Sequence, residues 1–131
     1  MPIIKSLLGL NKTTYLLFAA LWLLGVTIGS LVSVSVVNEV ETNIRVSDKL
    51  VHGIFYFGNT ILWYCYLRKA NFKNVLPKVS LFSFVYGIVI EVLQYILPYD
   101  RSFDLKDILA NSVGILIAIF LINFWLASRL H

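Results

Sequence analysis

The chain has 131 residues, of which 59% are hydrophobic and 14% are charged, and its formal net charge is +4. A soluble domain is about 45–50% apolar and about 25% charged, so this composition excludes an ordinary soluble globular domain. The apolar residues form four runs of about 20, the length at which a helix spans a bilayer. We therefore predict an all-α polytopic membrane protein, one domain over residues 1–131, built as an antiparallel bundle of four transmembrane helices. The predicted helices cover residues 14–36, 49–67, 77–97 and 105–126.

The first run, YLLFAALWLLGVTIGSLVSVSVV, could be mistaken for a cleaved signal peptide because Lys5 and Lys12 precede it. The apolar part of a signal peptide is only about 7–15 residues long. This run is much longer, so we predict a retained helix. The preceding segment PIIKSLLGL favours a short interfacial helix.

Local signals mark where the later helices begin and end. Ser47 is suited to cap the second helix, and Pro77 suits the first turn of the third. Pro98 is expected to end the third helix, because the residue before a proline is driven out of the helical region. The fourth helix is expected to start at Ser102 or Asp104.

The fourth helix also carries small residues at every fourth position, namely Ala110, Gly114 and Ala118. A stripe of small residues on one face allows two helix backbones to approach closely in a membrane. We therefore predict that Gly114 lies at a contact between helices.

The basic residues predict the orientation of the bundle. Seven of them fall at the N-terminus, in the middle connection and at the C-terminus: Lys5, Lys12, Arg68, Lys69, Lys73, Lys78 and Arg129. Four antiparallel helices place these three regions on one side, and the positive-inside rule makes that side cytoplasmic. We expect both termini to be cytoplasmic, the lipid bilayer to be the main partner, and nucleic acid not to be one.

The acidic residues gather on the opposite side. Six lie in or beside the two outer connections: Glu39, Glu41, Asp48, Asp100, Asp104 and Asp107. The seventh, Glu91, lies in the outer half of the third helix, so any chemistry is expected at the outer side. The single cysteine, Cys65, cannot form an intrachain disulfide and is expected to be buried as a small apolar residue.

Glu91 is the polar residue that is hardest to explain as structural. It lies about 9 Å inside the end of its helix, at 1.5 Å per residue. An intramembrane carboxylate is costly and is a functional candidate by default. Gln94 shares its helix face. Counting residues from a turn centred near Arg101 puts Asn111 level with Glu91 and puts Asp107 close to Gln94.

The second helix adds a further polar stripe. Asp48 and His52 are four residues apart and share a face, which Tyr56 and Asn59 continue inward. Three helices thus send polar residues into the outer half of the bundle at similar depth. We predict that they line one water-accessible pocket that faces outward.

Each of these polar residues also has a structural interpretation. Asp104 and Asp107 could form an Asp version of the capping box, and Asp48 could be a first-turn acid favoured by the helix dipole. His52 could be hydrogen-bonded in a polar crevice, and Asn111 could bridge two helices. The bases of this region could face lipid headgroups: Lys49, Arg101 and Lys106.

The segments SDKLVHGIFYFG, at 47–58, and IEVLQYILPYDRSFDLKDILANSVG, at 90–114, resemble the VanZ-like family of bacterial membrane proteins. The resemblance covers residues 45–125. The matching positions are Asp48, Lys49, His52, Glu91, Gln94, Arg101, Asp104, Asp107, Asn111 and Gly114. The resemblance implies a four-helix plan, a location in the bacterial cytoplasmic membrane and a cell-envelope role. Its founding member is associated with low-level resistance to teicoplanin, a glycopeptide.

The main functional hypothesis is a protein that binds or modifies a lipid-linked or peptidoglycan-type compound at the outer leaflet. The candidate catalytic residues are Glu91, His52 and Asp107. The candidate binding residues are Asp48, Lys49, Gln94, Arg101, Asp104 and Asn111, of which the two cations, Lys49 and Arg101, would hold a phosphate or carboxylate. The alternatives are a small proton-coupled transporter, a non-catalytic interaction protein, and polar groups that only hold the helices together. No cofactor is expected: His52, Glu91 and an Asp have suitable ligand types for a metal, but their spacing matches no metal motif.

Overall fold

The computed structural model describes residues 2–31, 48–97 and 103–129. These residues are helical, apart from short turns and connecting residues, and contain no strand. The elements are α1 (Pro2–Leu8), α2 (Lys12–Leu31), α4 (Asp48–Lys69), α5 (Val75–Ile96), α6 (Leu105–Leu121) and the π-helical η1 (Ile122–Leu126). The predicted all-α class is confirmed, and the PIIKSLLGL segment is helical as expected.

Three of the described helical segments are long and apolar enough to cross a membrane: Lys12–Leu31, Val75–Ile96 and Leu105–Leu126. They correspond to the first, third and fourth predicted spans. The fourth predicted span, 105–126, ends at the residue predicted. α4 has 22 residues but is less apolar, because it carries the polar stripe of the second predicted span.

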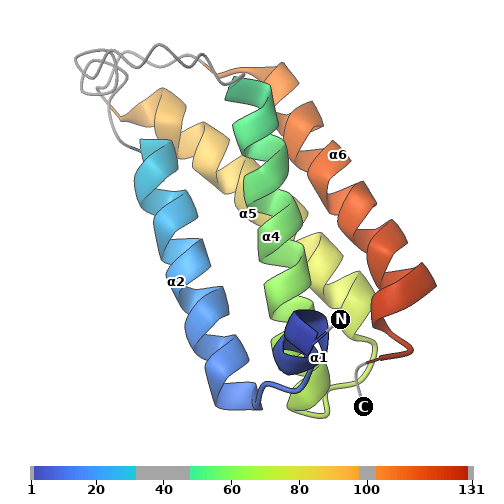
Figure 1. Ribbon diagram of the computed structural model, residues 1–131. Coiled ribbons are helices and arrows are strands. Elements are labelled where there is room, and N and C mark those ends of the chain that lie inside the picture. Colours follow the sequence, from blue (N-terminus) through green and yellow to red (C-terminus); the bar gives the residue numbers. More distant parts are fainter. Residues whose placement is uncertain (1, 32–47, 98–102, 130–131) are drawn as a thin grey trace.

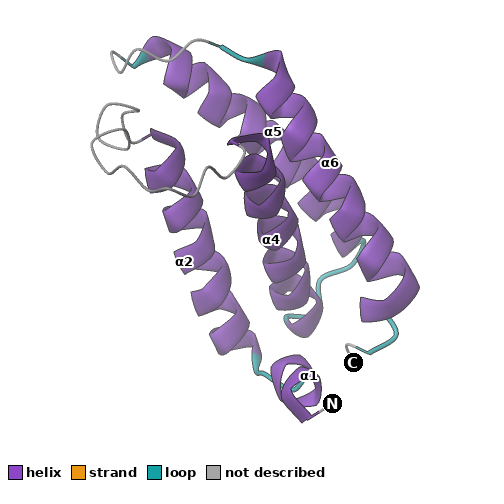
Figure 2. Ribbon diagram, turned by 45° about the horizontal axis from the view of Figure 1, so that its top comes forward, coloured by secondary structure: helices purple, strands orange, loops and turns teal. Residues whose placement is uncertain are grey.

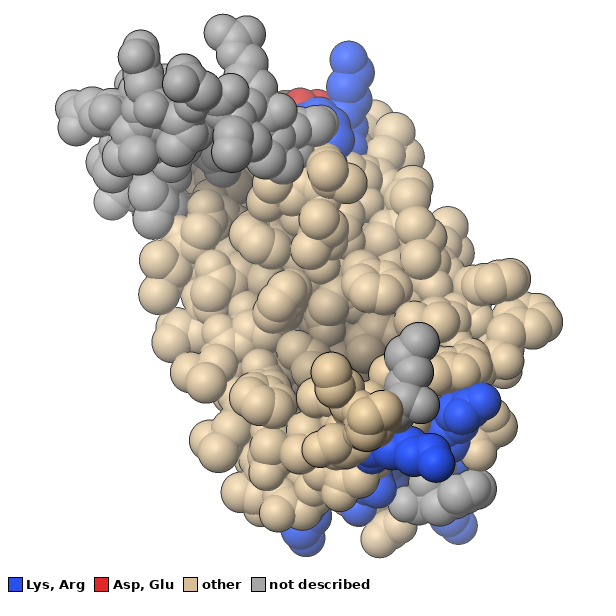
Figure 3. All heavy atoms as spheres, in the orientation of Figure 1, with Lys and Arg blue, Asp and Glu red and all other residues tan. Residues whose placement is uncertain are grey.

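α4 lies in the middle of the bundle and contacts α2, α5 and α6 (Figures 1 and 2). α4 and α6 begin, and α5 ends, at one end of the molecule, which we call the polar end. The opposite end, which we call the basic end, holds α1, η1 and the turn between α4 and α5. In the view of Figure 3, Lys and Arg side chains gather at the basic end, and a belt without charged side chains separates them from the charges at the polar end.

Local sequence accounts for the helix ends. Asp104 caps α6, and its side chain accepts a hydrogen bond from the Lys106 N–H at 2.9 Å, which confirms the predicted start. Pro77 lies in the first turn of α5, as predicted. Leu97 ends α5 in an extended conformation, the conformation that a following proline favours. Ser47, Pro98 and Ser102 lie outside the described residues.

Glycines allow α4 to pack closely against α6 and α2. A Cβ atom built on Gly114 of α6 would lie 2.1 Å from the backbone oxygen of Gly53 in α4. The predicted contact at Gly114 is therefore confirmed, and its partner is backbone rather than a side chain. On the other side of α4, Gly58 lies against the Trp22 ring of α2, and the Trp22 indole N–H donates to the Phe55 carbonyl at 2.8 Å.

The bundle interior divides into an apolar half and a polar half. Near the basic end a buried apolar cluster includes Tyr15, Tyr64, Val79 and Ile122, and Cys65 is buried within it, as predicted. Large apolar side chains cover the outside: Leu21, Leu116 and Phe124 are among many that are more than half exposed. An apolar exterior around a partly polar interior is the arrangement expected in a bilayer.

Candidate functional site

The polar half of the interior begins at the N-terminus of α6, where a carboxylate from α5 meets the helix cap. The first N–H groups of a helix have no partner within that helix. The Asp104 N–H, at the cap position, donates to Glu91 Oε1 at 2.8 Å. In a capping box the residue three positions later would accept this bond, and that residue is Asp107. Glu91 takes this place instead, which leaves the Asp107 side chain available to α4.

Lys49 of α4 bridges the two aspartates of α6. Its ammonium donates to Asp104 Oδ2 at 2.8 Å and also to Asp107 Oδ1. The hydrogen bond from Lys49, followed by the one from the Lys106 N–H, lowers the pKa of the Asp104 carboxyl below its ordinary value. Lys49 and Asp104 are both a little under 40% exposed, so this bridge forms the mouth of the site. Lys49 is therefore paired with acids and does not stand alone facing headgroups.

His52 lies one turn deeper on the same face of α4. Its Nδ1 atom is hydrogen-bonded to Asn111 Oδ1 at 3.0 Å, and its Nε2 atom lies 3.8 Å from Asp107 Oδ2. Both ring nitrogens face oxygen atoms, so an imidazole that carries two protons could donate to Asn111 and form an ion pair with Asp107. Asp107 thus lies between a lysine and a histidine, and Asn111 fixes the orientation of the ring.

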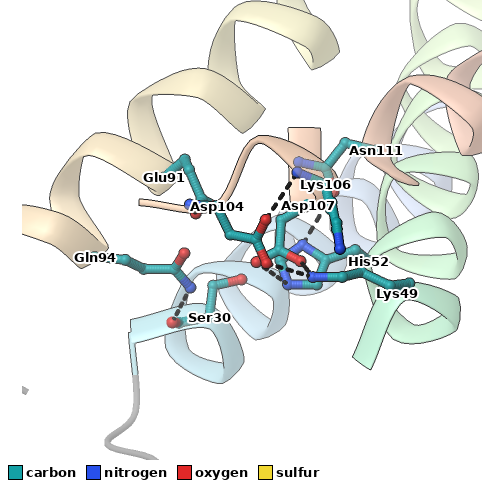
Figure 4. A network of polar contacts seen from close by, with 9 residues as sticks. All are labelled: Ser30, Lys49, His52, Glu91, Gln94, Asp104, Lys106, Asp107 and Asn111. Atoms are coloured by element: carbon teal, nitrogen blue, oxygen red, sulfur yellow. Dashed lines mark hydrogen bonds and ion pairs between the residues drawn. The ribbon is translucent and has the colours of Figure 1, made fainter. Parts of the chain in front are cut away.

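Glu91 closes the back of the site and is 1% exposed. Figure 4 shows its carboxylate directed toward Asp107, His52 and Lys49, all of which come from α4 and α6. Its second oxygen, Oε2, has no hydrogen-bond partner among the described residues. A buried polar atom without a partner is uncommon in proteins, and this one is free to accept a bond from the hydroxyl or ammonium group of a ligand.

Gln94 contacts α2 rather than Asp107, the residue that the sequence analysis placed close to it. Its amide nitrogen donates to the Ser30 carbonyl of α2 at 2.6 Å, so it joins α5 to α2 beside the site (Figure 4). Ser30 was missed by the sequence analysis, because a backbone carbonyl leaves no motif. The residue count also placed Glu91 level with Asn111, whereas Glu91 is bonded to Asp104, nearer the loop.

A second polar layer lies deeper in the bundle. The Asn59 amide and the Thr60 hydroxyl each donate to Ser83 Oγ at 3.1 Å, and the three side chains are at most 1% exposed. Tyr56, also buried, lies between this layer and the site and has no partner for its hydroxyl among the described residues. Ser83 was missed, although it lies eight residues before Glu91 and hence on the same face of α5.

Two predicted site residues have side chains outside the described part of the chain. Arg101 lies outside the described residues, and of Asp48 only the backbone, at the start of α4, is described. Among the described residues, those of the polar site included, no three His, Cys, Asp or Glu side chains are grouped so that they could hold a metal ion. Six of the predicted site residues are each hydrogen-bonded to at least one other of the six: Lys49, His52, Glu91, Asp104, Asp107 and Asn111.

Comparison with known proteins gives one family. No curated protein and no solved structure matches the chain. The VanZ/LLP1 family model matches residues 10–126. This match includes α2, which the resemblance by motif did not reach, together with every residue of the polar site. The chain, with its apolar membrane helices and its polar site between α4, α5 and α6, belongs to the VanZ/LLP1 family.

Proposed function

We propose that the protein crosses the bacterial cytoplasmic membrane four times, with α4 as the remaining span and both termini in the cytoplasm. A helix of 22 residues is about 33 Å long at 1.5 Å per residue, enough for a hydrocarbon core of about 30 Å. The polar side chains of α4 are a small cost here, because His52, Asn59 and Thr60 face the bundle interior. With the basic end inside, the polar site faces outward.

The site supports a protein that binds, and could chemically modify, the polar part of a cell-envelope compound, either lipid-linked or of peptidoglycan type. The observation that carries this proposal is Glu91: a carboxylate 1% exposed, with one oxygen unpartnered, beside the pair of Asp107 and His52. Placing a carboxylate there is costly. If the group served only to cap α6, one oxygen would be enough.

The neighbouring groups have suitable acid–base chemistry. Glu91 Oε2 could accept the proton of a ligand hydroxyl or amine, and the His52 imidazole, whose ring nitrogens can donate or accept a proton, could supply or take up a second one. Asp107 would stabilise the protonated imidazole, and Lys49 would hold Asp107 in place. Binding and proton transfer would thus use the same set of side chains.

The test compares wild type with Glu91→Gln, which keeps the shape but cannot act as a carboxylate. Each protein, purified in detergent, is incubated with an envelope lipid extract that contains peptidoglycan precursors, and retained compounds are identified by native mass spectrometry. We expect wild type to retain a compound that Glu91→Gln loses, with the melting temperatures of the two proteins similar. Teicoplanin susceptibility of a host that expresses each variant at equal membrane level gives a second readout, motivated by the family.

The control is Ser80→Ala, because the Ser80 hydroxyl donates only to the Leu76 carbonyl of its own helix. This variant should retain the compound. If Glu91→Gln binds the same compound as wild type and leaves the phenotype of the host unchanged, Glu91 has a structural role only and the proposal fails.

A small proton-coupled carrier is the second candidate. It is favoured by the deeper layer of Asn59, Thr60 and Ser83, which extends polar groups below the site. Against it, the apolar cluster around Tyr64, Val79 and Ile122 fills the basic end. Reconstitution into vesicles that contain a pH-sensitive dye tests this candidate: proton uptake that Glu91→Gln abolishes would favour the carrier over the binding protein.

A further inference from the structure

An apolar groove runs along the outside of the bundle between α4 and α6, and it reaches the mouth of the polar site. It has a volume of about 510 Å³, within the usual range of ligand pockets. The lining residues are Lys49, Leu50, Gly53, Ile54, Phe57, Ala110, Val113, Gly114 and Ile117. Lys49 is the only charged residue among them, and it is also the residue that bridges Asp104 and Asp107.

The shape of the groove follows from the glycine contact described above. Gly53 and Gly114 have no side chains to fill the crevice where α4 and α6 meet, while Leu50, Ile54 and Val113 stand about half exposed along its sides. In a membrane such a crevice is in contact with lipid chains along its length. One chain lying in it would bring the head of its own lipid to Lys49.

The charges at Lys49 indicate the kind of headgroup. The ammonium is already paired with two carboxylates, Asp104 and Asp107, and Glu91 contributes an unpartnered oxygen behind them. An anionic headgroup would gain one cation but would meet three carboxylates. A zwitterionic head with a primary ammonium matches both signs: its phosphate would lie at Lys49, and its ammonium would donate to the carboxylates.

We propose that the groove between α4 and α6 holds one acyl chain of an aminophospholipid, whose phosphate binds at Lys49 and whose ammonium enters the acidic site. This inference rests on the proposed binding function and names the class of its ligand. The polar site and the groove then form one continuous binding surface, apolar along the helices and charged at the polar end.

The experiment measures which lipid copurifies with the protein. The full chain is reconstituted in nanodiscs made from equal parts of phosphatidylethanolamine, phosphatidylcholine and phosphatidylglycerol with matched acyl chains, then released, and bound lipid is counted by native mass spectrometry. Wild type should retain one phosphatidylethanolamine in roughly tenfold preference over the other two lipids, the ratio expected from one charge-assisted hydrogen bond.

Two tryptophan variants locate the lipid. Val113 lines the groove and is 55% exposed, so the larger side chain of Val113→Trp should fill the groove. This variant should abolish the preference for phosphatidylethanolamine without lowering the melting temperature. Leu21→Trp is the matched control, because Leu21 is 63% exposed and lines another apolar groove, between α2 and α4, that has no charged residue. This variant should retain phosphatidylethanolamine as wild type does.

The proposal is overturned by equal retention of the three lipids, by a preference for phosphatidylglycerol, or by a dimer whose interface replaces the lipid. It also fails if Val113→Trp retains phosphatidylethanolamine as Leu21→Trp does. Each of these results leaves the Glu91→Gln test untouched, so a failure of the lipid assignment can be told apart from a failure of the proposed function.

Discussion

Replacing Gly114 by alanine tests how the packing of α4 against α6 supports the polar site. The new Cβ would lie 2.1 Å from the Gly53 backbone oxygen, whereas an ordinary contact is at least 3.4 Å. Because the obstacle is backbone, no side chain can turn away, and the two helices must separate by more than 1 Å. Overpacking of this kind costs about 1–3 kcal/mol, against a gain of up to about 1 kcal/mol from the better helix propensity of alanine.

Separation of the helices would also open the site. The bond of His52 to Asn111, at 3.0 Å, and that of Lys49 to Asp104, at 2.8 Å, both join α4 to α6. Lengthening them by more than 1 Å takes them beyond hydrogen-bonding distance. We therefore expect Gly114→Ala to lower the melting temperature in detergent and to lose the ligand that wild type retains.

The other glycine of the same contact provides the control. A Cβ on Gly53 would meet only the Ala110 carbonyl oxygen, at 3.6 Å, and one on Gly25 would meet nothing within 4 Å. Gly53→Ala and Gly25→Ala should therefore match or exceed wild type in thermal stability. If Gly114→Ala is as stable as Gly53→Ala, then α4 and α6 are not in backbone contact and the reasoning is refuted.

Topology is tested by introducing single cysteines into a background without Cys65: in intact cells Asn43→Cys should react with an impermeant thiol reagent and Lys73→Cys should not, and the reverse pattern would place the polar site in the cytoplasm. The lowered pKa of Asp104 predicts a dependence on pH. Its bond to Lys49 should stabilise the fold fully above the ordinary aspartate pKa of about 3.9 and lose that effect as the pH falls through the lower pKa of the folded protein. The gap in melting temperature between wild type and Lys49→Gln should thus be constant near neutral pH and shrink only in stronger acid; a gap that shrinks near pH 6 would contradict this assignment.

The sequence by itself determined the helices and the membrane environment. Apolar runs of about 20 residues predicted the spans, and the end of the last one was placed at the residue where η1 ends. Glu91 was also predicted as a site residue from the sequence, because a carboxylate is rare within a membrane helix. These are local properties: hydropathy and the helical repeat depend only on residues close together in the chain.

Only the tertiary structure decided which groups meet. The sequence left a capping box of Asp104 with Asp107 open as one interpretation and placed Asp107 near Gln94, whereas Glu91 accepts from the Asp104 N–H and Gln94 bonds to Ser30. A residue count through a loop carries an error of a few residues, and one residue rotates a helical side chain by about 100° around the axis. The depth and rotation of each helix are set by contacts between helices, such as Gly114 against Gly53. Those contacts therefore decide both the partners of Glu91 and the existence of the groove beside Lys49.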